Sequence, residues 1–165
     1  MDHPIRVATA ADADHIAEIY NHYIANTVVT FEEEPVAGAE MRRRMEDVFG
    51  ASLPWLVAAS GGRITGYAYA TKWKARSAYR FSVETTVYLA DGFGRQGLGS
   101  RLYEELFRLL SEKGIHAAIG GIALPNDASV ALHEKFGMRK VAHFEQVGFK
   151  FGTWVDVGYW QRFLS

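Results

Sequence analysis

The chain contains no cysteine, and this absence removes several classes of chemistry at once. Without thiols there is no disulfide framework, no cysteine nucleophile and no thiolate metal site. The charge is also nearly balanced: the chain has 18 Lys and Arg residues and 19 Asp and Glu residues, for a net charge of −1. Nucleic-acid binding usually requires a basic face, so we expect no nucleic-acid partner.

Long apolar runs are lacking as well. No run reaches the 18 apolar residues typical of a membrane span, and the first twenty residues lack the basic-then-apolar pattern of a signal peptide. We therefore expect a cytoplasmic protein that makes no membrane contact. With 48% hydrophobic and 22% charged residues, the 165-residue chain has a globular composition, and we expect a single domain over residues 1–165.

The first half of the chain predicts two helices and three strands. Apolar residues recur at helical spacing from Ile16 to Ile24, after a capping-box pair formed by Thr9 and Asp12. We expect Pro35 to open the second helix, because proline fits the first helical turn. The strand-like segments are residues 4–10, 54–60 and 63–73, of which the last two are joined by a Gly-Gly hairpin turn.

In the second half strands alternate with helices. We expect a long helix ended by Gly114 and a short helix that begins at Asn126 and ends before Gly137. The predicted elements are strand 81–90, helix 98–113, strand 116–124, helix 127–136 and strands 139–149 and 154–164. This order predicts an α+β fold, with helices packed on one mixed sheet.

Residues 92–97, "GFGRQG", match the G-x-G-x-x-G spacing of dinucleotide-binding turns. A dinucleotide fold places that loop after its first strand, with further parallel strand–helix units beyond it. Here the loop follows the fourth predicted strand, the next strand ends in "GIALPND", and only one more helix remains. The NAD-dependent oxidoreductase hypothesis is therefore weak.

The same loop suits another phosphate ligand. Gly92, Gly94, Gly97 and Gly99 permit positive φ and clear one face of the turn, so that backbone N–H groups can converge on an anion. Arg95 and Ser100 add a positive charge and a hydroxyl, while the absence of G-K-[ST] argues against an ATP loop. We expect a diphosphate held without obligatory magnesium; the alternative is a glycine-rich connection with no ligand.

The stretch "GRQGLGS" resembles the acetyl-CoA loop of the GNAT superfamily of N-acetyltransferases. The stretches "WKARSAYRFSVETTVYL", "ALPNDASVALHEKFGM" and "VGFKFGTWVDVGYWQ" resemble the branch that acts on phosphinothricin, methionine sulfoximine and methionine sulfone. The resemblance implies a mixed, largely antiparallel twisted sheet flanked by about four helices. It also implies acetyl-CoA as co-substrate, a small amino-acid-like acceptor and a homodimer. No metal is expected, since the histidines show no ligand spacing.

Two positions depart from the family pattern. Gly94 stands where the loop usually has Gln or Arg, so one side-chain contact to the pyrophosphate is lost, and Arg95 can supply the charge instead. Phe151 stands where the herbicide-detoxifying enzymes tend to have histidine, and phenylalanine cannot titrate. This second departure favours amino-acid analogues in general as substrates.

Glu84 is the candidate general base. It interrupts a β-rich run, "SVETTVYL", where burial would raise the pKa of a carboxyl group toward a useful value. The family's catalytic glutamate lies in the corresponding strand. The alternative is a solvated residue on an outward face, which the alternation with Val83 and Thr85 permits.

Further residue roles follow from the resemblance. His133 replaces a tyrosine that protonates the leaving thiolate in many GNAT enzymes, and the alternative is a satisfied, partly buried histidine. Asn126 is expected to reach the coenzyme A arm, although an N-cap needs no ligand. The remaining expected cofactor contacts are Val87, Tyr88 and Leu89 through their backbone and Arg95, Gln96, Gly97, Leu98, Gly99 and Ser100 in the loop.

Four residues are expected at the acceptor. Lys74 and Arg76 can hold the substrate's carboxylate and its tetrahedral oxyanion, because guanidinium presents a planar fork to such groups. Tyr79 and Phe31 are expected to wall that pocket, as the matching aromatics do in the family. The alternatives are a solvated basic loop and, for the whole chain, a CoA-binding regulatory module without turnover.

Overall fold

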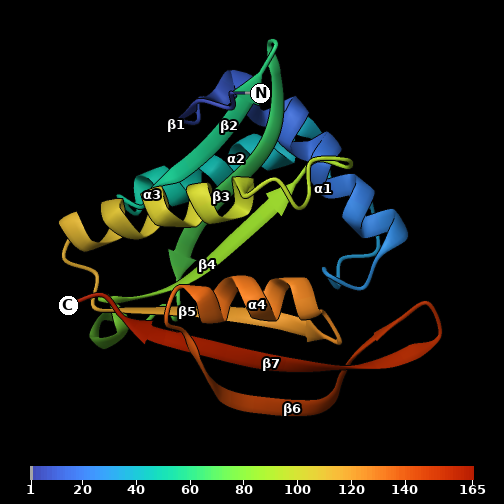
Figure 1. Cartoon of the computed structure of the whole chain (residues 1–165), viewed down its shortest axis with the longest axis vertical. Helices are drawn as coiled ribbons and strands as arrows, with labels where there is room; N and C mark the ends of the chain where they lie inside the picture. The colour runs from blue at the N-terminus through green and yellow to red at the C-terminus, as the bar shows by residue number, and fades with distance from the viewer. Residues whose placement is uncertain (1) are drawn as a thin grey trace.

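The computed structural model describes residues 2–165 and shows one twisted sheet that carries helices on both faces (Figure 1). The strand order is β1-β2-β3-β4-β5-β7-β6, and only the β4–β5 pair is parallel. The strands are β1 Ile5–Val7, β2 Trp55–Ser60, β3 Arg63–Lys72, β4 Ser82–Leu89, β5 Ala117–Leu124, β6 Arg139–Lys150 and β7 Thr153–Phe163. The helices are α1 Ala13–Asn26, α2 Gly38–Gly50, α3 Leu98–Glu112 and α4 Asp127–Lys135, with short 3-10 turns at Ala10–Asp12 and Ser77–Tyr79. The predicted α+β order is confirmed.

The second helix begins later than Pro35, which corrects the sequence expectation. Residue Val36 is held outside the helix by the side chain of Asn21 in α1, which accepts from the Val36 N–H at 2.7 Å and donates to the Val36 carbonyl at 2.9 Å. These bonds keep the segment before α2 extended. The helix starts at Gly38, once both backbone groups of Val36 are satisfied.

Helices α1 and α3 pack on opposite faces of the sheet. Tyr88 of β4 packs against Tyr20 and Tyr23 of α1, with ring centroids 5.5 and 4.9 Å apart. Thr85 of the same strand has its side chain on the opposite face of the sheet, and its hydroxyl donates to the Tyr103 hydroxyl of α3 at 3.4 Å. The apolar stripe predicted for α3 is fully buried on that face, with Leu102, Leu106 and Leu110 inaccessible to solvent.

Strands β4 and β5 pair over a short stretch and then separate. Their register covers only Ser82, Val83 and Glu84, opposite Ala117, Ala118 and Ile119. From Thr85 to Leu89, β4 keeps its partner β3 on one side, and the structure records no β5 pairing on the other. An opening in the middle of the sheet therefore begins at Glu84.

None of the helices formed by residues 2–165 combines the length and the apolar character that a membrane span requires.

Candidate active site

A cleft of about 790 Å³ lies between β4, the loop before α3 and α4. It is lined by nine of the ten residues that the sequence analysis expected at the cofactor, and Gln96 alone among them lies outside the lining. The nine are Val87, Tyr88, Leu89, Arg95, Gly97, Leu98, Gly99, Ser100 and Asn126. The structure thus brings the glycine loop, the free side of β4 and the start of α4 together around one elongated space.

The loop before α3 has the backbone shape that an anion site requires. Gly92 and Gly97 adopt φ values of 85° and 75°, and Gly97 is the N-cap of α3. Arg95 itself adopts φ 64°, a left-handed conformation. The first N–H groups of a helix lack intrahelical acceptors and carry the positive end of its dipole, so the cleft ends in a ready anion cradle.

Lys135 is a cleft residue that the sequence analysis missed. Its ammonium group donates to the Ser100 hydroxyl at 3.0 Å, which places a positive charge from α4 beside the start of α3. The sequence placed Lys135 on the helix that follows the expected cofactor residue Asn126, which is a partial indication that it lies near the cofactor. Its approach to Ser100 depends on the tertiary arrangement.

An inner pocket of about 200 Å³ lies where the cleft reaches the separation of β4 and β5. Its wall includes Glu84, His133 and Gly121, and it shares Val87 and Asn126 with the cleft. The shared residues place the two spaces next to each other. The arrangement joins an anion cradle to a carboxyl group.

Burial raises the pKa of Glu84, and the positive charge of Lys74 opposes that shift. Glu84 faces Gly121 of β5, where a β-carbon would lie only 3.4 Å from the carboxylate oxygen Oε1. The atom nearest to that position is Cε1 of Tyr159, at 3.0 Å, so the Tyr159 ring lies beside the carboxylate. A carboxyl group whose pKa is raised by burial, inside a pocket, suits proton transfer to or from a ligand.

His133 is buried and hydrogen-bonded at both ring nitrogens. Its Nδ1–H donates to the Ser129 carbonyl at 2.7 Å, since a carbonyl oxygen only accepts. Its Nε2 then accepts from the Tyr103 hydroxyl at 3.1 Å, and burial lowers the pKa of the imidazole. The network favours a neutral, oriented histidine, and Tyr103 is a member of it that no local sequence pattern identified.

Asn126 serves as the N-cap of α4 and also lines both spaces. Its Oδ1 accepts from the Ser129 N–H at 3.1 Å, which satisfies one orphan donor of the helix. The capping role and a ligand role are compatible, because the amide N–H₂ of the same side chain is a separate donor.

The four expected acceptor residues lie outside the two spaces just described. Lys74, Arg76 and Tyr79 are exposed in the segment between β3 and β4, and of these Lys74 influences Glu84 electrostatically. Phe31, between α1 and α2, lies against Gly148 of β6, where a β-carbon would come within 2.3 Å of the Phe31 ring. The structure therefore places Phe31 on the β6–β7 hairpin.

Lys150, also in that hairpin, supports the wall of the inner pocket from a distant part of the chain. Its side chain is only 2% exposed, and its ammonium group donates to the Thr30 carbonyl at 2.8 Å. Thr30 and Val29 line the inner pocket. The hairpin thereby fixes the loop between α1 and α2.

Within residues 2–165, no group of three or more His, Asp or Glu side chains is arranged to hold a metal ion.

Comparison with known proteins places this arrangement in a family. A family model described as an acetyltransferase (GNAT) domain matches residues 5–158. Phosphinothricin N-acetyltransferase of Streptomyces viridochromogenes is 44% identical over 161 residues, which cover 96% of this chain and 86% of the relative. The L-methionine sulfoximine/L-methionine sulfone acetyltransferase of Salmonella typhimurium is 34% identical over 161 residues, which cover 98% of this chain and 94% of the relative.

A solved structure agrees over the whole chain. The GNAT superfamily phosphinothricin acetyltransferase of Sinorhizobium meliloti, in complex with acetyl-CoA, superimposes with a TM-score of 0.96 at 37% identity, covering 100% of this chain and 90% of the other. Sequence and fold agree. The chain therefore belongs to the GNAT family and is an acetyl-CoA-dependent N-acetyltransferase.

Proposed function

We propose that the chain transfers the acetyl group of acetyl-CoA to the amino group of a small amino-acid analogue of the phosphinothricin, methionine sulfoximine or methionine sulfone type. The observation that carries this proposal is that the cleft, which includes the cradle before α3, shares lining residues with the inner pocket that holds the partly buried carboxyl group of Glu84. The names of the relatives support this acceptor class.

In this proposal the backbone N–H groups before and at the start of α3 hold the diphosphate of coenzyme A. Arg95 and Lys135 add positive charge beside it, and Ser100 adds a hydroxyl. The side of β4 that β5 leaves free offers backbone groups from Val87 to Leu89 to the pantetheine arm, and the Leu89 carbonyl among them also accepts from the Tyr23 hydroxyl. The acetyl group is thereby delivered to the inner pocket.

The proposed reaction is a direct transfer. Glu84 takes a proton from the acceptor's ammonium group, directly or through water, and the freed amine attacks the thioester carbon. A nitrogen–carbon bond forms, the carbon–sulfur bond breaks, and a β4 N–H stabilises the oxygen on which negative charge develops. As the intermediate collapses, the nitrogen loses its second proton and the departing thiolate takes up one proton, directly or through water. His133 is proposed to position this relay, because its Nε2 holds the Tyr103 hydroxyl beside the inner pocket.

Lys74 and Arg76 are proposed to attract the acceptor's carboxylate and its side-chain oxyanion. They are two of the three exposed cations, with Arg80, in the segment that leads into β4. Tyr79 and Phe31 are proposed as apolar walls of the acceptor site. Phe151, in the β6–β7 hairpin, is 61% exposed and offers no titrating group, which supports amino-acid analogues in general as acceptors.

A homodimer in the cytoplasm is part of the proposal. The β6–β7 hairpin extends beyond the rest of the sheet (Figure 1), and β6 is an edge strand. The exposed apolar side chains of the β6–β7 hairpin favour burial against a second copy of the chain. They are Phe144, Val147, Phe149, Phe151 and Trp154.

The test is a free-thiol release assay with acetyl-CoA across phosphinothricin, methionine sulfoximine, methionine sulfone, ordinary amino acids and polyamines. We expect turnover with the first three, and a loss of about 100-fold or more in kcat for Glu84→Gln. Glu104→Gln, an exposed position in α3, is the matched control and should keep its activity. A protein that binds acetyl-CoA but acetylates no amine would instead be a regulatory module.

A further inference from the structure

His3, which precedes β1, is a buried histidine that the proposed reaction does not use. It is only 3% exposed, and its Nδ1 atom lies 3.0 Å from the hydroxyl oxygen of Thr65 in β3. The Thr65 hydroxyl donates its proton to the Ala58 carbonyl at 3.3 Å, so its oxygen accepts from Nδ1–H of His3. This hydrogen bond fixes the orientation of the His3 ring.

The other ring nitrogen of His3 is unpaired. Nε2 is buried and has no hydrogen-bond partner within residues 2–165. A buried polar atom without a partner lowers stability, and native proteins contain few such atoms. Stability alone therefore does not explain a histidine at this position, and its contacts with the loop before α3 suggest a role.

The His3 ring packs against the one aromatic residue of that loop. The rings of His3 and Phe93 meet edge to face, with centroids 5.6 Å apart and ring planes inclined by 83°. Gly92 and Gly94, on either side of Phe93, line the cofactor cleft, whereas Phe93 is packed against the hydrophobic core. The loop thus presents its glycines to the cleft while His3 holds its aromatic side chain.

Hydrogen bonds tie both ends of the loop to His3 and its partner Thr65. At the start of the loop, the Ala90 N–H donates to the Thr65 carbonyl at 2.9 Å, and the Phe93 N–H donates to the Ala90 carbonyl at 3.1 Å. Beyond its other end, the guanidinium group of Arg101, near the start of α3, donates to the His3 carbonyl at 3.1 Å. His3 therefore contacts the loop itself and the helix that follows it.

We propose that His3 is a positioning residue for the cofactor, which holds the loop before α3 in the shape that binds the diphosphate of coenzyme A. This inference rests on the proposed role of the loop and adds to it a residue about 90 positions earlier in the chain. A loop that adopts its binding shape for only part of the time binds its ligand more weakly in proportion. Removal of the His3 ring should therefore weaken the binding of acetyl-CoA without slowing acetyl transfer at saturation.

The test compares two acetyl donors: acetyl-CoA and S-acetyl-pantetheine, which carries the same thioester but lacks the diphosphate. In His3→Ala we expect the KM for acetyl-CoA to rise roughly three- to tenfold, as the loss of one aromatic pair predicts, with kcat unchanged. The kcat/KM for S-acetyl-pantetheine should stay the same. Calorimetric titration with coenzyme A needs no acceptor, and the Kd should rise by the same factor.

Phe93→Ala removes the loop's half of the same contact. Phe93 is only partly buried, so this variant keeps the test available if His3→Ala does not fold. We expect the same selective rise in the KM for acetyl-CoA. In the double variant the KM should rise no further than in either single variant, because the two changes remove one shared contact.

Two controls separate positioning from a general loss of stability. Leu110→Ala, a buried position at the far end of α3, should destabilise the fold but leave the KM for acetyl-CoA unchanged. His15→Ala, at an exposed position of α1, should change neither. An unchanged KM for acetyl-CoA in His3→Ala, or equal losses of kcat/KM with both donors, would overturn the proposal. A native protein that uses both donors equally well would instead disprove the diphosphate site itself, and the role of His3 with it.

Discussion

Replacing Lys150 by methionine tests whether the β6–β7 hairpin supports the active site. Methionine keeps most of the apolar stem of the side chain but removes the ammonium group that donates to the Thr30 carbonyl at 2.8 Å. The two residues are 120 positions apart in the chain, so this bond joins the hairpin to the loop between α1 and α2.

The size of the effect follows from two opposing contributions. A hydrogen bond from a charged donor contributes about 1.5–3 kcal/mol, and its removal leaves a backbone carbonyl unsatisfied. Against this, burial disfavours the ammonium group and lowers the pKa of Lys150 below its ordinary 10.5, although Glu33 and Glu32 partly counteract the shift. We expect the free energy of unfolding to fall by about 1–2 kcal/mol in the variant.

The assay is urea unfolding followed by circular dichroism, with Lys140→Met as the control. Lys140 is an exposed lysine of the same strand, and its replacement should change the free energy of unfolding by less than about 1 kcal/mol. With a denaturant slope of about 1–3 kcal/mol/M, Lys150→Met should lower the midpoint by roughly 0.5–1 M. Because Thr30 lines the inner pocket, the KM for the acceptor should rise as well.

The stability difference between the native protein and Lys150→Met should change with pH in one direction. Because the folded pKa of Lys150 is lowered, the folded protein binds fewer protons than the unfolded chain at pH values between that pKa and 10.5. The stability of the native protein relative to Lys150→Met should therefore rise with pH across this interval. Equal stability of Lys150→Met and the native protein, or equal losses in Lys150→Met and Lys140→Met, would refute the anchoring role.

Three further predictions concern the active site and the core. Burial raises the pKa of Glu84 above its ordinary 4.5, so kcat/KM should fall with acidification at a pH above that value, and Glu84→Gln should lack this limb of the profile. In Gly120→Ala the new β-carbon would lie 2.6 Å from Nε2 of His133, and thermal melting should show a loss of about 1–3 kcal/mol, while Gly50→Ala, with no atom within 4 Å, should show none. Leu106→Ala, at a fully buried position, should cost about 2–5 kcal/mol in urea unfolding.

Much of the fold was predictable because its signals are local. The helical spacing of apolar residues in α3, the Gly114 stop and the Asn126 cap all concern residues within a few positions of one another. Pro35 shows where local reasoning fails, because the side chain of Asn21, fourteen residues earlier, holds the next residue out of the helix.

The residues of the candidate site also differ in whether a local sequence pattern identifies them. The glycine loop and Glu84 stand out in the sequence, since four glycines before a helix and a carboxylate in a β-rich run are local anomalies. Lys135, Tyr103 and Lys150 do not stand out, because each acquires its role from a partner at least 30 positions away.

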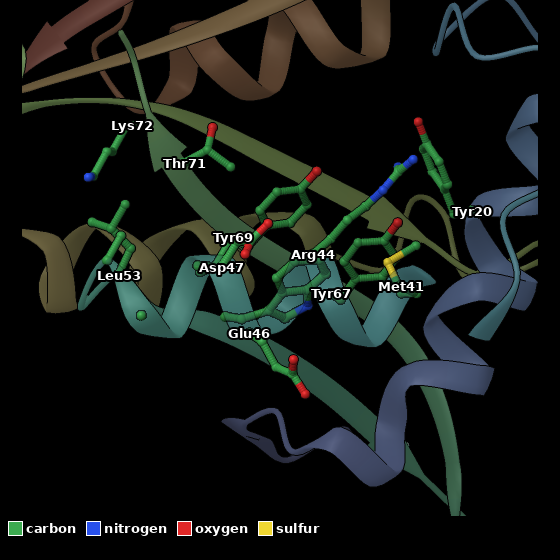
Figure 2. A pocket seen from close by; sticks show the side chains of 14 residues that line it. Tyr20, Met41, Arg44, Glu46, Asp47, Leu53, Tyr67, Tyr69, Thr71 and Lys72 are labelled. Carbon is green, nitrogen blue, oxygen red and sulfur yellow. The ribbon is translucent and has the colours of Figure 1, made fainter. Parts of the chain in front are cut away.

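By itself, the sequence determined the order of the elements, the glycine-rich turn before α3 and the identity of the candidate base, because backbone preference and hydrophobic periodicity are properties of short segments. Only the tertiary structure decided where β4 and β5 separate, that the inner pocket with Glu84 lies beside the cleft and that α2 leaves a cavity over Trp55 (Figure 2). Those features depend on how distant surfaces fill space against one another, and no short stretch of sequence records that.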